Sequence, residues 1–332
     1  MKKIRRLLFI ILIALTTVTL TGCENKLVVF DPQGPVARNL SDLIIYSIIF
    51  MAVIVVIVFI LFGTIIWKYR ERKDNMDYEP EEEEGSKALE ITWFVIPVLI
   101  VIALTIPTVM VTYELEGVPE GYEDEEPLVI HVTSADWKWV FSYPEQDIET
   151  VNYINIPEDR AVQFKMTSTG TMQSFWVPAL GGQKYTMANM QTNLYLVADN
   201  PGSYIGRNTS FNGKGYAHMD FEVLAQTRAD FEEWVEEVKA TADTLTAEKY
   251  KEIIKPGNVG RMTFNETHLQ WIDHAHGYSE EFIDFSNYKA PHGDHGDHGD
   301  HEEDETSETP EESNGTSHEG HDSHSSHGNG GE

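Results

Sequence analysis

Cysteine is almost absent from this chain of 332 residues, because Cys23 is the only one. A single thiol excludes an intrachain disulfide and any metal site that needs two thiolates. Positive charge is also scarce, since 24 lysines and arginines are outnumbered by 54 aspartates and glutamates, which gives a formal net charge of −30. No nucleic-acid partner is expected, because phosphate backbones are bound mainly through Lys and Arg.

Charge is missing altogether from two long segments, 43–67 and 91–113. At a rise of about 1.5 Å per residue, a helix of either length spans a hydrocarbon core of about 30 Å. We therefore predict a transmembrane helix hairpin over 43–113 with a connecting loop at 68–90. A buried core helix is the alternative, although soluble cores rarely contain uncharged runs this long. Neither segment contains histidine, so neither offers an axial ligand to a haem.

Cys23 stands at the end of a secretory signal. Four basic residues within the first six positions precede an apolar run that ends in Leu20-Thr21-Gly22-Cys23. This pattern is typical of a signal with small residues at its cleavage site, and it resembles a bacterial lipobox. We expect a lipoprotein signal peptide at 1–22, lipidation of Cys23 and an extracellular N-terminal segment at 23–42.

The basic residues indicate the orientation of the predicted hairpin. Four of them lie between 68 and 73, whereas 114–126 contains seven acidic residues and no basic one. Cytoplasmic loops of membrane proteins carry the excess of Lys and Arg. The loop 68–90 is therefore predicted in the cytoplasm, and the chain from Glu114 onward on the extracellular face of a bacterial cell membrane.

After residue 126 the pattern changes to short strands separated by turns. Trp137, Trp139 and Phe141 alternate with Lys138, as expected for a strand with one apolar face. Several such strands in about a hundred residues predict an all-β Greek-key sandwich over 127–225.

Two further segments follow the predicted sandwich. In 226–289, Phe231, Trp234 and Val238 recur at helical spacing, which predicts a C-terminal helical extension. The last segment, 290–332, is rich in His, Asp and Glu and poor in apolar residues, which predicts disorder. Such a tract can also bind metal weakly. The tail candidates for metal binding are His292, His295, His298 and His301.

Two membrane helices followed by an external sandwich form the layout of subunit II of the haem–copper oxidases, and four motifs resemble that family in its order. They are Leu89-Glu90-Ile91-Thr92-Trp93, Asp136-Trp137-Lys138-Trp139, Ser174-Phe175-Trp176-Val177-Pro178-Ala179-Leu180-Gly181 and Pro201-Gly202-Ser203-Tyr204. The resemblance implies that the sandwich is cupredoxin-like.

In copper-bearing members of that family, the sandwich holds a dinuclear centre through two Cys, two His and one Met. Only the thioether is kept here, and amide and phenol oxygens are poor copper ligands. His218 lies nearby, but one His and one Met do not complete a copper site. The positions that match the ligands are Gln173, Asn208, Asn212, Tyr216 and Met219.

The copper-free pattern resembles the quinol-oxidising branch, including the aa3-type menaquinol oxidases of Bacillus-like bacteria. The resemblance implies subunit II of a proton-translocating quinol oxidase that binds no cofactor itself. Haems, copper and the quinol site are then expected in subunit I. Subunits III and IV and membrane lipids are expected partners, menaquinol is the expected substrate of the complex, and cytochrome c is not an expected donor.

Glu90 lies at the cytoplasmic end of the second predicted span. By resemblance it matches a carboxylate at the mouth of the K-channel, a proton-uptake route into subunit I. The alternative is a carboxylate that is favoured by the dipole at the start of a helix.

Other interpretations remain open at this stage. The chain could be a copper-bearing cytochrome c oxidase subunit, which the missing cysteines disfavour, or a surface lipoprotein that captures metal through its His-rich tail. The aromatic stripe of Trp137, Trp139 and Phe141 is an electron route or, without copper, core packing. A metal site formed by His268, His274 and His276 is conceivable but lacks a recognisable ligand spacing.

Overall fold

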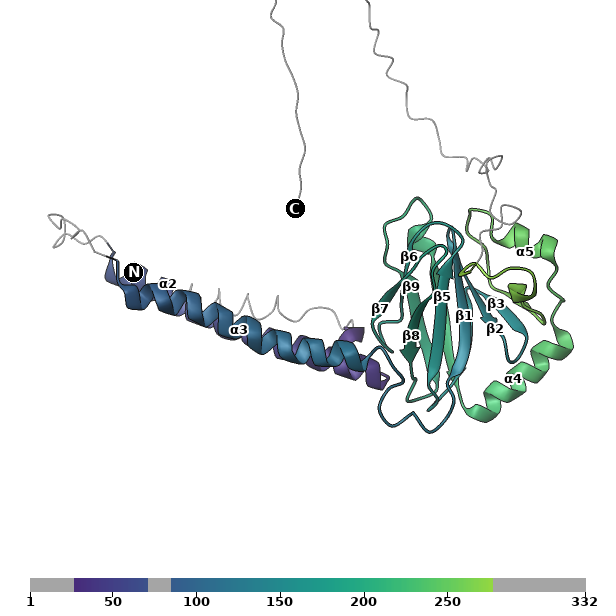
Figure 1. The fold of residues 1–332 in the computed structure, drawn as a ribbon, viewed down its shortest axis with the longest axis horizontal. Helices are drawn as coiled ribbons and strands as arrows, with labels where there is room; N and C mark the ends of the chain where they lie inside the picture. Colours follow the sequence, from purple (N-terminus) through teal and green to yellow (C-terminus); the bar gives the residue numbers. More distant parts are fainter. Residues whose placement is uncertain (1–26, 71–84, 277–332) are drawn as a thin grey trace, which may run out of the picture. The chain divides into compact units, whose positions relative to one another are not determined.

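The computed structural model describes residues 27–70 and 85–276, and Figure 1 shows them as a ribbon. The predicted lipidation site, Cys23, lies outside the described residues. So do the four histidines proposed as tail metal candidates, His292, His295, His298 and His301.

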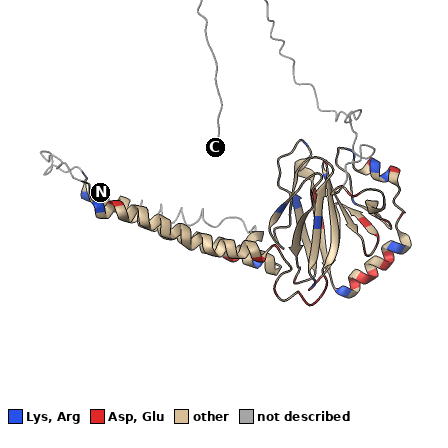
Figure 2. Cartoon of the chain, in the orientation of Figure 1, with Lys and Arg blue, Asp and Glu red and all other residues tan. Residues whose placement is uncertain are grey.

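Two long apolar helices, α2 (Pro35–Lys68) and α3 (Lys87–Glu114), contain the two uncharged segments. Each is long and apolar enough to cross a membrane, and its most apolar stretch is not buried against the rest of the described chain. Figure 2 shows the middle of both helices free of charged residues. Pro35 suits the first turn of α2, where a backbone N–H would have no helical partner.

Within the described residues, ten strands and an eleventh, β11, form a sandwich of two sheets. Sheet A has the order β11-β3-β2-β1-β5-β8 and sheet B the order β4-β10-β9-β6-β7, where β11 comes from the C-terminal extension. Parallel pairs, β1 with β5 and β4 with β10, occur in both sheets beside antiparallel ones. The ten strands are β1 (Leu128–Ala135), β2 (Lys138–Tyr143), β3 (Ile148–Val151), β4 (Tyr153–Pro157), β5 (Val162–Ser168), β6 (Gln173–Trp176), β7 (Gln183–Thr186), β8 (Thr192–Leu196), β9 (Gly202–Asn208) and β10 (Asp220–Gln226). This architecture confirms the predicted fold of two membrane-type helices followed by a β-sandwich.

The space between the two sheets is filled by aromatic side chains. Trp139 and Phe141 of β2 point into it and are fully buried, as the alternation of that strand predicts. The rings of Phe175 and Phe221 stack with their centroids 5.0 Å apart, and the Trp139 ring meets both edge-on at 5.4 and 5.6 Å. Core packing therefore accounts for these two members of the aromatic stripe.

Residues 247–276 of the C-terminal extension cover the outer face of sheet A (Figure 1), whereas Phe231 and Val238 join the inter-sheet core. The helices of the extension are α4 (Arg228–Thr241) and α5 (Ala247–Ile253), and each begins with a threonine that caps the helix through its side chain. The extension is not only helical, because β11 (Met262–Phe264) pairs with β3 at the edge of sheet A. Val140 and Val151 of sheet A pack with Tyr250, Ile253 and Phe264 of the extension in a second apolar cluster.

The start of α2 is packed into the sandwich. Val36 belongs to the inter-sheet core, and Arg38 forms an ion pair with Asp199. A Cβ added to Gly34 would lie 2.1 Å from the carbonyl oxygen of Val197, so only glycine fits there. The first membrane-type helix is thus joined to the sandwich by packing as well as by the chain.

Candidate functional site

Five positions of this chain match the copper ligands of copper-bearing family members. The structure brings three of them together at one end of sheet B. Gln173 begins β6, Asn208 ends β9, and Asn212 lies in the loop that follows β9. The Gln173 side-chain oxygen accepts hydrogen bonds from Asn208 Nδ2 at 2.8 Å and Asn212 Nδ2 at 2.5 Å. Asn208 Nδ2 also lies 3.0 Å from Asn212 Oδ1. We call these three residues the amide cluster.

The groups around the amide cluster complete its hydrogen bonding. Asp136 accepts from Gln173 Nε2 at 3.1 Å, and Asn208 Oδ1 accepts from the backbone N–H of Ser174 at 2.9 Å and of Ser210 at 3.0 Å. Gln173 is fully buried and Asn208 is 6% exposed. Each of these amide oxygens already accepts a hydrogen bond from a protein N–H. The cluster is therefore a closed hydrogen-bonded network rather than a set of free metal ligands.

The side chains of the other two ligand positions do not join the amide cluster through any described hydrogen bond, although the backbone N–H of Asn208 donates to the Met219 carbonyl at 3.2 Å. Tyr216 lies in a short 3-10 helix, η3 (Tyr216–His218), and its ring contacts that of the exposed Phe211 at 5.1 Å between centroids. Met219 is fully buried in the inter-sheet core, where its carbonyl accepts from Trp139 Nε1 at 3.1 Å. Over the described ranges 27–70 and 85–276, no group of three or more His, Cys, Asp or Glu is arranged to hold a metal ion.

Trp137 covers the loop that carries Asn212 of the amide cluster. It lies just before β2, and its Nε1 donates to the carbonyl of Asn212 at 3.0 Å. A Cβ on Gly213 or Gly215 would come within 2.7 and 2.4 Å of the indole ring, and Gly213 has φ +109°. The loop therefore needs glycine at these two positions for close packing on Trp137. Sequence reasoning placed Trp137 in the aromatic stripe and missed this contact.

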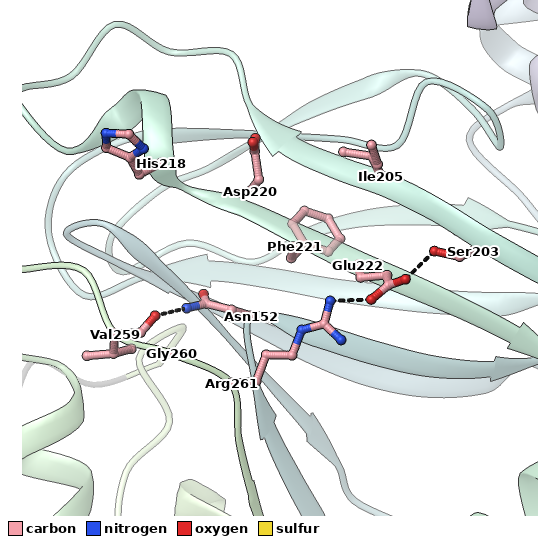
Figure 3. A pocket seen from close by; sticks show the side chains of 10 residues that line it. All are labelled: Asn152, Ser203, Ile205, His218, Asp220, Phe221, Glu222, Val259, Gly260 and Arg261. Carbon is pink, nitrogen blue, oxygen red and sulfur yellow. Dashed lines mark hydrogen bonds and ion pairs between the residues drawn. The ribbon is translucent and has the colours of Figure 1, made fainter.

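An open pocket of about 500 Å³ lies beside this region, and Figure 3 shows its lining. Ser203 and Arg261 both donate to the carboxylate of Glu222, which holds the pKa of that carboxyl below its usual value. His218 and Asp220 also line the pocket. Because Arg261 belongs to the extension and Glu222 to β10, this ion pair connects the extension to sheet B.

Glu90 lies in the first turn of α3, and its side chain is exposed. Its backbone N–H donates to the carbonyl of Ser86, the residue that precedes the helix. This position agrees with both interpretations made from the sequence, so its role in proton uptake stays a prediction.

The three histidines of the extension do not form one ligand set, because each has its own partner. His268 pairs with Glu149, His274 with Tyr250, and His276 with Asp273. Glu149 was not singled out from the sequence, since a glutamate in a strand with no recognised motif carries no signal for burial.

Comparison with known proteins places these features in a family context. Residues 23–111 match the family model described as cytochrome c oxidase subunit II, transmembrane domain. The chain is 55% identical over 270 residues to quinol oxidase subunit 2 of Bacillus cereus, a match that covers 81% of this chain and 92% of the relative. It is 53% identical over 270 residues to quinol oxidase subunit 2 of Bacillus subtilis, with 80% and 84% covered. Among solved structures, the periplasmic domain of subunit II of cytochrome oxidase from Bradyrhizobium japonicum aligns with 20% identity and a TM-score of 0.34, over 35% of this chain and 96% of that one.

Proposed function

The chain belongs to the quinol oxidase subunit 2 family, and from this premise we propose that it serves a quinol oxidase as a subunit that holds no redox metal itself. The complex would oxidise a quinol, with menaquinol as the proposed substrate, reduce O2 to water and translocate protons. Haems, copper and the quinol site would lie in subunit I, and subunits III and IV would complete the complex.

The amide cluster is the observation that carries this proposal. Its side chains occupy three of the positions that resemble copper ligands, and they satisfy one another instead of leaving donor atoms free. Carboxamide groups are hard, weak ligands for copper compared with thiolate and imidazole. A quinol dissolves in the bilayer and can deliver electrons there, so the sandwich needs no external copper relay.

The packing around α2 supports a structural role. Val36 and Gly34 fit tightly into the sandwich, and Leu115, just after α3, packs against the same core. The two helices would brace subunit I within the membrane while the sandwich covers its extracellular side. Lipidation of Cys23 would add an anchor on that side, and Glu90 would collect protons for the K-channel on the cytoplasmic side.

The test is purification of the complex from membranes, followed by three measurements: haem content, copper content and the electron donor. The proposal expects co-purification with a haem-containing subunit I, oxidation of a quinol but not of reduced cytochrome c, and no copper beyond that of subunit I. A copper-to-haem ratio higher than subunit I accounts for would contradict the proposal.

A deletion of 290–332 separates this proposal from metal capture by the tail. Quinol oxidation should continue at the wild-type rate after the deletion. Removal of the whole chain should instead prevent assembly of the oxidase.

A further inference from the structure

The interface between sheet A and the C-terminal extension contains a buried polar cluster beside its apolar one. The polar cluster consists of Glu149 on β3, Tyr250 on α5, and His268 and His274 in the segment that follows β11. All four side chains are at most 2% exposed. Burial of ionisable groups is costly unless they are paired, so their contacts decide how firmly the extension is held.

Glu149 and His268 form a buried hydrogen-bonded pair across this interface. Glu149 Oε2 accepts from His268 Nδ1 at 2.6 Å, from the His268 backbone N–H at 2.9 Å and from Ser142 Oγ at 2.9 Å. The two residues are 119 positions apart in the chain. This pair therefore connects the sandwich directly to the end of the described extension.

Tyr250 connects this hydrogen-bonded pair to His274. Its ring stacks on that of His268, with the centroids 4.2 Å apart and the planes 6° from parallel. Its hydroxyl lies 2.8 Å from His274 Nε2. Two buried atoms, Glu149 Oε1 and His274 Nδ1, have no hydrogen-bond partner within the part of the chain that the structure describes. The cluster thus consists of one buried carboxyl–imidazole hydrogen bond and one further buried imidazole.

His274 cannot readily take up a proton in this position. The pKa of its imidazole is lowered to about 3, mainly by burial. The neighbouring His268 adds to this decrease, and Asp273 opposes it with a smaller effect. His131 of β1 also has a lowered pKa, through burial and through Lys165 of β5. The charged and titratable groups that face the two buried histidines are Glu149, Tyr250, His131, Asp273, His276 and, through His131, Lys165.

We propose that this cluster is an acid-sensitive contact that holds the segment 247–276 on sheet A, and that acid releases this segment while the sandwich and α4 remain folded. Release exposes His274 to water, where an imidazole takes up a proton below a pKa of about 6.5. The docked form excludes that proton, so each pH unit below this value favours release by about tenfold. The inter-sheet core, as far as the structure describes it, consists of apolar and aromatic side chains and contains no histidine.

Hydrogen–deuterium exchange of the purified oxidase complex tests this proposal, with the exchange rates corrected for the intrinsic effect of pH. Amides of 247–276 should open about tenfold more often per pH unit between about pH 6 and pH 4. Amides of β1 and β5 should show no comparable change. If the extension opens equally often at pH 7.5 and pH 4.5, the proposal is wrong, and this result depends on no variant.

Two variants show whether His274 causes the change. His274→Gln keeps a hydrogen-bonding group for Tyr250 but does not titrate, so its opening should depend much less on pH. His276→Gln is the matched control, because His276 is a histidine of the same segment that pairs with Asp273 but has a side chain that is 72% exposed. It should keep the wild-type pH profile. A full pH response in His274→Gln would overturn the assignment.

Discussion

Replacement of Asn208 by alanine should destabilise the sandwich substantially, because this side chain is the centre of the amide cluster. Asn208 makes five contacts within hydrogen-bonding distance, two through Oδ1 and three through Nδ2. The substitution removes all of them. It also leaves the buried N–H of Ser174 and the buried oxygen of Gln173 with fewer partners.

The size of the effect follows from this geometry. One carboxamide can form four good hydrogen bonds at most, with a net value of about 1 kcal/mol each. Water that enters the vacated space recovers part of this, so we expect a loss of about 3 kcal/mol. In a domain of this size, about 1 kcal/mol shifts Tm by roughly 2–4 °C, which predicts a decrease of about 6–12 °C.

Calorimetry of the full chain in detergent can measure this shift. Asn193→Ala is the matched control, because Asn193 is an exposed residue of β8 whose side chain accepts one hydrogen bond, from Gln191. Its Tm should change by no more than about 2 °C, as for most surface substitutions. A shift in Asn208→Ala no larger than that of the control would refute the reasoning. Copper-dependent stabilisation that Asn208→Ala abolishes would show that the cluster binds metal after all.

Three more predictions concern other parts of the molecule. Gly206→Ala should lower the free energy of unfolding by about 2 kcal/mol in thermal denaturation, since its Cβ would lie 2.0 Å from the buried Phe221 ring. Gly170→Ala is the control and should leave stability unchanged, because its Cβ would meet nothing within 4 Å. The pKa of buried Lys138 is lowered to about 8. Between that pH and the usual lysine pKa, the unfolded chain therefore binds a proton that the folded chain lacks. Stability should therefore rise by about 1.4 kcal/mol per pH unit from about pH 8 to pH 10, and Lys138→Met should remove this rise in urea titrations. Glu90→Gln should slow quinol oxidation severalfold at an unchanged KM for quinol; wild-type turnover would exclude Glu90 from proton uptake.

Much of the fold could be predicted from the sequence because its signals are local. An uncharged run long enough to cross a bilayer identifies each helix, and alternation places Trp139 and Phe141 in the core. Helix α2 nevertheless begins at Pro35, before the uncharged segment, because its first turns pack against the sandwich. Hydropathy alone does not record such a contact.

The candidate site was predicted only in part. Motif spacing identified Gln173, Asn208 and Asn212, which do come together, but it could not show that Tyr216 packs against Phe211 instead. The buried polar cluster escaped prediction for a different reason. A polar residue that alternates with apolar ones is typical of a solvent-facing position, yet Glu149 is fully buried because a distant segment covers its strand.

The cover that the extension provides on sheet A also determines where the folding unit ends. A chain cut after β10 would expose Val140 and Val151 to water and leave Glu149 without its partner. It would also free the edge of β3, which β11 now pairs, and unpaired edges promote aggregation. Expression of the outer domain for structural or antibody work should therefore retain the chain through residue 276, because a shorter fragment that ends with the sandwich would be prone to aggregate through this exposed surface.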